Sequence, residues 1–155
     1  MISHLNKKNN PNYVDISKKT KSHRFAKAKG LVVFSKKTFS EIKNLKTKKG
    51  SIINIASIAA IIGVKKTTEI IPLTHPISID NIDIDIKLDK ENKTIIVICS
   101  VKSFAKTGVE MEALSGVSAA CLTIYDMCKA IDKKIKIRNI QLLEKKGGKS
   151  DFFNK

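Results

Sequence analysis

Two charged residues near the end of a strongly apolar stretch are the first candidates for chemistry. Asp126 and Lys129 lie three residues apart in LTIYDMCKA, so both side chains would lie on one face of a helix. A carboxylate that is partly buried beside an ammonium group can have a shifted pKa and transfer protons, as acid–base catalysis requires. A plain ion pair on a helix surface is the alternative. The partly buried pair is favoured because its neighbours are apolar: Ile124, Met127, Cys128 and Ile131.

Two carboxylates lie at the other end of the same stretch. In KTGVEMEAL, Thr107 and Glu110 match the capping box, which predicts Thr107 as the N-cap of the helix. Glu112 lies inside the predicted helix beside Met111, where no capping role explains it. The head of the helix is therefore a second candidate for proton transfer or ligand binding.

Three other positions could contact a ligand. His75 lies in PLTHP, where the two flanking prolines predict a stiff, extended loop that fixes the direction of the imidazole. Lys49 and Gly50 form a basic turn ahead of a predicted helix, which is a weak phosphate-binding pattern because it lacks the Walker spacing. The segment KKGGKS, which begins at Lys145, is basic and flexible, and a linker is its alternative interpretation.

Hydrophobic spacing predicts the elements that position these groups. Residues 81–89, NIDIDIKLD, alternate apolar and mostly charged side chains and are predicted as a half-buried strand. A more apolar strand follows over 93–104, then the helix over 106–130 and a last strand over 134–143. Earlier in the chain we expect strands over 13–17 and 30–34, a short helix from Thr38 or Ser40 to Leu45, and a helix over 51–64.

This order of elements predicts an α+β fold, with helices packed on one face of an antiparallel sheet. A chain of 155 residues has room for one core. We expect a flexible N-terminal arm over residues 1–12, a single domain over 13–150 and a C-terminal tail over 151–155.

No metal site is predicted, because the histidines are scattered and the cysteines form no CxxC pair. Buried, reduced thiols in a cytoplasmic protein are the expected state of Cys99, Cys121 and Cys128. No apolar run reaches the roughly 18 residues that a membrane span needs. We therefore expect no membrane association.

The formal net charge is +16, which raises the alternative of a basic α+β module that binds nucleic acid. Nearly all of the positive charge is lysine, however, because Arg24 and Arg138 are the only arginines. Aromatic residues make up only 5% of the chain. Since arginine is the usual reader of bases and aromatic rings stack on them, we favour a general lysine bias and expect no nucleic-acid partner.

Five motifs occur in order between about Val14 and Ser150: RFAKAKG, IPLTHP, KTGVEMEAL, LTIYDMCKA and LLEKKGGKS. Together they resemble the cyclic pyranopterin monophosphate synthase family (MoaC), which acts in molybdenum-cofactor biosynthesis. The resemblance implies a ferredoxin-like α+β fold. It also implies a lyase that converts a cyclised dihydro form of GTP, made by a radical-SAM enzyme, into a pyranopterin with a cyclic phosphate, releasing diphosphate. No cofactor of the enzyme is implied, and a divalent ion accompanying the triphosphate is left open.

The resemblance further implies a homohexamer, a trimer of dimers with active sites at the dimer interface. It implies catalytic roles for Asp126, Lys129 and Lys49. The implied substrate contacts are Thr74, His75, Glu110, Met111, Glu112, Lys65 and Lys145, and the family usually has cysteine where Thr74 stands.

The spacing on the helix supports a shared site. Glu112 and Asp126 are 126 − 112 = 14 residues apart. This corresponds to about 21 Å along a helix, too far for one small-molecule site to use both directly. We therefore predict that two subunits combine Glu112 of one chain and Asp126 of the other.

Overall fold

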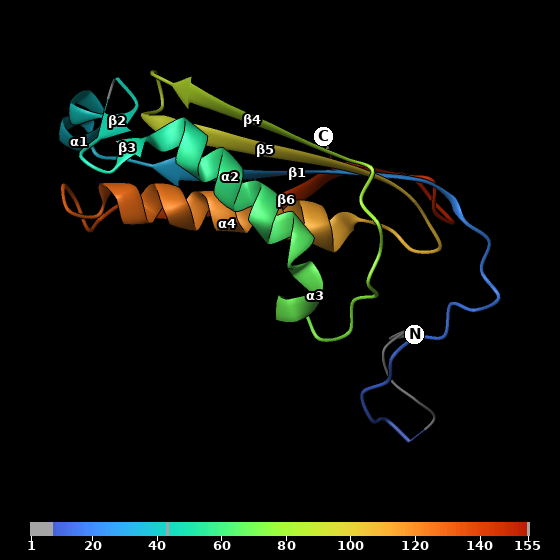
Figure 1. The fold of residues 1–155 in the computed structure, drawn as a ribbon. Helices are drawn as coiled ribbons and strands as arrows, with labels where there is room; N and C mark the ends of the chain where they lie inside the picture. Colours follow the sequence, from blue (N-terminus) through green and yellow to red (C-terminus); the bar gives the residue numbers. More distant parts are fainter. Residues whose placement is uncertain (1–7, 43, 155) are drawn as a thin grey trace.

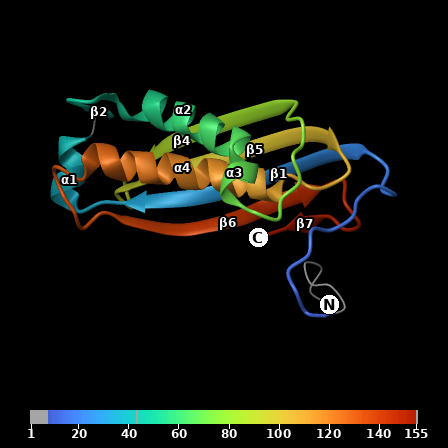
Figure 2. The ribbon, with the colours of Figure 1, turned by 60° about the horizontal axis from the view of Figure 1, so that its bottom comes forward.

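The computed structural model describes residues 8–42 and 44–154. Within this part of the chain, five antiparallel strands form one sheet in the order β4-β5-β1-β6-β7, and helices cover one of its faces (Figures 1 and 2). The α+β prediction is confirmed, whereas the narrower ferredoxin-like assignment stays a prediction. The strands are β1 (Ser22–Val33), β4 (Asn81–Asp89), β5 (Thr94–Ala105), β6 (Lys136–Lys146) and β7 (Phe152–Phe153).

Small residues on β1 allow a helix to approach the sheet closely. Ala26 and Ala28 are fully buried on the face that packs against the helices, as alternation with period two requires. Gly30 continues this row, and a Cβ built on it would lie 2.6 Å from Cγ1 of Val117. The long helix α4 (Glu110–Cys128) therefore lies directly on the centre of the sheet.

A second helix, α2 (Ile52–Lys65), packs against α4. Their contact also depends on glycine, because a Cβ on Gly63 would lie 2.8 Å from the carbonyl oxygen of Ser115. Gly116 of α4 similarly faces Val64 of α2. With the sheet on one side and α2 on another, α4 is buried over most of its surface, which explains its apolar composition.

Shorter elements gather at the two ends of α4 (Figure 1). Near its C-terminal end lie α1 (Lys36–Glu41) and the hairpin of β2 (Lys46–Thr47) and β3 (Gly50–Ser51). Near its N-terminal end lie α3 (Thr67–Ile70) and the loop that follows it. Together with the two ends of α4, these two groups of elements carry most of the candidate site residues.

Several sequence predictions about element boundaries were wrong. Residues 13–17 form no strand, because they pair with no strand of the sheet. The strand predicted from Gly30 begins at Ser22 instead, since every residue from Ser22 onward pairs with β5. Helix α1 is capped by Ser35, whose Oγ accepts a hydrogen bond from the Thr38 amide, and not by Thr38 or Ser40.

The predicted capping box of the long helix is also wrong. Helix α4 begins at Glu110, with Val109 at its N-cap and no side chain capping it. The Glu110 carboxylate instead pairs with Lys145 of β6, at 3.3 Å between Nζ and Oε1. Thr107 therefore lies in the loop that precedes the helix.

The predicted strands over 81–89, 93–104 and 134–143 correspond to β4, β5 and β6, with boundaries displaced by up to three residues. The predicted helix over 51–64 is α2. The predicted N-terminal arm lies mostly outside the described residues, and the predicted tail contributes the short strand β7, which pairs with β6. Among residues 8–42 and 44–154, no helix is long and apolar enough to cross a membrane.

Candidate active site

The C-terminal end of α4 holds a carboxylate between two lysines. Asp126 lies 2.7 Å from the Nζ atoms of both Lys49 and Lys129, each on a different carboxylate oxygen. Lys129 caps the end of α4, whereas Lys49 comes from the turn between β2 and β3. Gly50 has a φ of 113°, a backbone conformation that glycine adopts without strain, so the turn can present Lys49 to the helix.

The two lysines determine the charge state of Asp126. The hydrogen bond from Lys129, followed in size of effect by the one from Lys49, lowers the pKa of Asp126 to about 2. Asp126 in turn raises the pKa of Lys129. The prediction of a partly buried aspartate was wrong for the single chain, because the three side chains are each about half exposed, at 51–52%. The cluster therefore presents an ionised carboxylate and two cations on an open surface.

The N-terminal end of α4 forms one wall of a cavity of about 610 Å³. The opposite wall is the loop that contains Thr74 and His75. Thr74 closes a turn in this loop, because its Oγ1 donates to the Ile71 carbonyl at 2.8 Å. Five of the predicted site residues line the cavity: Thr74, His75, Glu110, Met111 and Glu112.

Glu112 is the only charged residue among the buried ones in the described part of the chain, with 4% of its surface exposed. Burial raises the pKa of Glu112 to about 6, and the nearby charge of Glu110 adds to this effect. No lysine, arginine or histidine within the described residues forms an ion pair with Glu112. Such a group can hold or release a proton near neutral pH.

The remaining predicted residues are placed less directly. Lys145 contacts the N-terminal end of α4 through its ion pair with Glu110. Lys65 ends α2 and lines neither this cavity nor the second one described below. Lys19, which lines the cavity together with Val14 and Ile16, was not among the predicted residues. A single lysine in a lysine-rich segment carries no signal that could have identified it.

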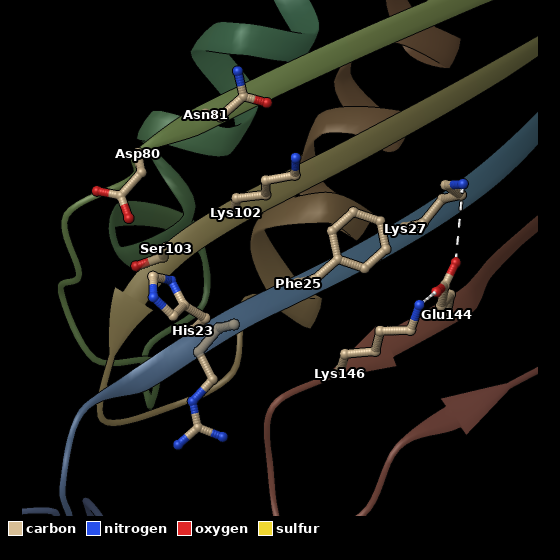
Figure 3. A pocket seen from close by; sticks show the side chains of 10 residues that line it. His23, Phe25, Lys27, Asp80, Asn81, Lys102, Ser103, Glu144 and Lys146 are labelled. Carbon is tan, nitrogen blue, oxygen red and sulfur yellow. Dashed lines mark ion pairs between the residues drawn. The ribbon is translucent and has the colours of Figure 1, made fainter.

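A second cavity, of about 800 Å³, lies on the sheet face that the helices leave uncovered (Figure 3). It is larger, but it contains none of the predicted site residues. It is lined by two acids, Asp80 and Glu144, and Glu144 pairs with Lys27 and Lys146. We therefore take the two ends of α4, where most of the predicted site residues lie, as the candidate site.

The fold and these groups define a class of protein: an α+β protein whose candidate ionisable side chains gather at the two ends of one buried helix. Comparison with known sequences identifies its family. The chain belongs to the MoaC family, whose sequence profile matches residues 13–148. The resemblance seen in the motifs is thereby confirmed.

Individual relatives match over nearly their whole length. The chain is 49% identical over 152 residues to a cyclic pyranopterin monophosphate synthase of Campylobacter jejuni, covering 98% of this chain and 97% of the relative. A protein of the same name from Helicobacter pylori is 47% identical over 153 residues, with coverages of 99% and 97%. Another from Clostridium acetobutylicum is 44% identical over 155 residues, with coverages of 100% and 96%.

Proposed function

We propose that this protein is a cyclic pyranopterin monophosphate synthase of molybdenum-cofactor biosynthesis. It converts a cyclised dihydro form of GTP into cyclic pyranopterin monophosphate and releases diphosphate. The observation that carries the proposal is the ionised Asp126 held between Lys49 and Lys129 at the end of α4. A carboxylate and two ammonium groups at this spacing suit a reaction that combines proton transfer with the loss of an anion.

The residue types match the individual demands of this reaction. Opening and reclosing a purine-derived ring needs several proton transfers, for which Asp126, Glu112 and His75 supply proton acceptors and donors. Lysines act as point charges toward a triphosphate and stabilise diphosphate as it leaves. The substrate is the product of a radical-SAM enzyme, so the redox step precedes this protein. We propose that it uses no cofactor of its own, although a divalent ion can accompany the triphosphate.

We further propose that the active site is shared between two subunits of a homohexamer, a trimer of dimers. In the described chain, Glu112 is a buried acid without a cation, whereas Asp126 is an exposed acid with two. Placing the head of one α4 beside the tail of its counterpart would bring a lysine-rich cluster to each buried glutamate. The helix layer also exposes apolar side chains that a neighbouring subunit would cover: Ile55, Ile58, Ile61, Ile62 and Leu122.

We place the protein in the cytoplasm, with the substrate and no nucleic acid or membrane as its partners. Its three cysteines are free thiols and are buried, which suits a reducing compartment.

Substitutions at the C-terminal end of α4 test the proposed chemistry. Asp126→Asn and Lys129→Met each remove one charge with little change in size, so we expect turnover to be nearly abolished while the fold persists. The measurement is product formation from cyclised dihydro-GTP at saturating concentration, with circular dichroism as a check on folding. Near-normal turnover in either variant would show that the assigned roles are wrong.

A further inference from the structure

The hydrogen bond made by His75 fixes where its proton lies. The Nε2 atom lies 2.7 Å from the backbone carbonyl oxygen of Val14. Because a carbonyl oxygen only accepts hydrogen bonds, Nε2 must carry a hydrogen. In the neutral ring this leaves Nδ1 unprotonated, with a lone pair that can accept a hydrogen bond or a proton.

An aromatic ring from the same segment packs on the imidazole. The ring centroids of Tyr13 and His75 are 4.0 Å apart, and the ring planes are inclined by 36°. Tyr13 is 48% exposed and does not belong to the hydrophobic core. Within the described part of the chain its hydroxyl makes no hydrogen bond. Among the ring contacts of the described residues, Tyr13 packs on His75 alone.

The segment that carries both contacts is held in place although it belongs to no strand. Lys106, which precedes α4, donates from Nζ to the Ser17 carbonyl at 2.9 Å. Asp15 accepts from the Ser17 amide at 2.8 Å. Val14 and Ile16 line the same cavity as His75, so the segment forms a wall of the site. His75 is consequently held between its own proline-flanked loop and an anchored segment some 60 residues earlier in the chain.

We propose that Tyr13 and the Val14 carbonyl are positioning groups for His75. The carbonyl selects the tautomer with a hydrogen on Nε2, and the Tyr13 ring restricts rotation of the imidazole. Together they keep Nδ1 available as the acceptor toward a ligand in the cavity. The activity readout of this proposal rests on the proposed function, whereas the tautomer does not.

Tyr13→Ala and Tyr13→Phe in the full-length protein separate positioning from simple packing. Tyr13→Ala removes the ring, so we expect kcat to fall about three- to tenfold, the range that corresponds to the loss of an aromatic pair, with KM little changed. Tyr13→Phe keeps the ring and loses only a hydroxyl that makes no hydrogen bond, so its kcat should equal that of the unmodified protein. The matched control is Phe104→Ala, which removes an exposed ring 5.0 Å from another histidine, His23, on a different part of the surface and should leave kcat unchanged.

Nitrogen-15 NMR of histidine-labelled protein gives a readout that does not depend on substrate. With His75 assigned through a His75→Gln variant, we expect Nδ1 of the neutral ring to show the shift of an unprotonated nitrogen. In Tyr13→Ala the two nitrogen shifts should move toward each other, as tautomers begin to exchange.

Three results would overturn the proposal: a hydrogen on Nδ1 in the unmodified protein, unchanged kcat in Tyr13→Ala, or an equal loss in Tyr13→Phe. If the unmodified protein forms no product while the NMR result is as expected, the proposed reaction fails and the positioning of His75 stands.

Discussion

Helix α4 separates two groups that the proposed enzyme has to use together, and this separation leads to a quantitative prediction. Glu112 and Asp126 both lie on α4, which runs without interruption from Glu110 to Cys128. The 126 − 112 = 14 residues between them correspond to about 21 Å along the axis. If two subunits share each site, mixing two inactive variants with substitutions at different ends of α4 should restore activity.

The expected recovery follows from counting sites. Mixing Glu112→Ala and Asp126→Ala subunits in equal amounts and letting them exchange at random makes about half of all dimers hybrid. In a hybrid dimer, one site contains both substitutions and the other site contains neither. About one quarter of all sites should then be intact, so the mixture should approach about one quarter of wild-type activity.

The assay compares the mixture before and after subunit exchange. Exchange is followed by native mass spectrometry of subunits that carry different tags, and activity is measured as product formed from cyclised dihydro-GTP. Each variant exchanged with itself is the control and should stay inactive. Hybrids that form and yet remain inactive, or a dilute monomer that is fully active, would rule out a site shared between two subunits.

Other properties can be tested on single variants. Because Lys129 and Lys49 hold the pKa of Asp126 at about 2, Lys129→Met should raise it toward 3.8 and Lys129→Arg should not, as measured by carbon-13 carboxyl titration; an unshifted pKa in Lys129→Met would contradict the pairing. In Gly63→Ala the new Cβ would clash with the Ser115 carbonyl. The clash should outweigh the gain in helix propensity, so the free energy of unfolding measured by denaturant titration should fall by about 1–2 kcal/mol. An unchanged midpoint would show that α2 and α4 can move apart without cost. A chelator should leave the melting temperature unchanged, because the described residues contain no group of three possible metal ligands among His, Cys, Asp and Glu; a drop of several degrees would reveal a structural metal.

Strong periodicity made much of the fold predictable from the sequence. The alternation in residues 81–89 and the long apolar stretch gave β4 and α4. The predicted ends of helices and strands were wrong where contacts with residues distant in sequence outweighed the local sequence pattern. The capping box at Thr107 failed because Glu110 pairs with Lys145, which is distant in sequence.

The candidate site was predictable to a different degree at its two ends. The pairing of Asp126 with Lys129 follows from helical spacing, whereas Lys49 approaches from a turn 77 residues away. A basic turn at Lys49 could be read from the sequence, but its catalytic role was implied only by the resemblance. The exposure of Asp126 could not be predicted, because it depends on which face of α4 the sheet and α2 cover. The contribution of Lys19 and Tyr13 depends on how an irregular segment lies across the cavity, which no periodicity encodes.

The most direct test of the proposed function is to supply the purified protein with cyclised dihydro-GTP alone and to quantify both products. We predict that cyclic pyranopterin monophosphate and diphosphate appear in equal amounts, and that neither appears with Asp126→Asn. The proposed function would be contradicted if the folded protein leaves the substrate unchanged. It would also be contradicted if diphosphate is released without the pterin.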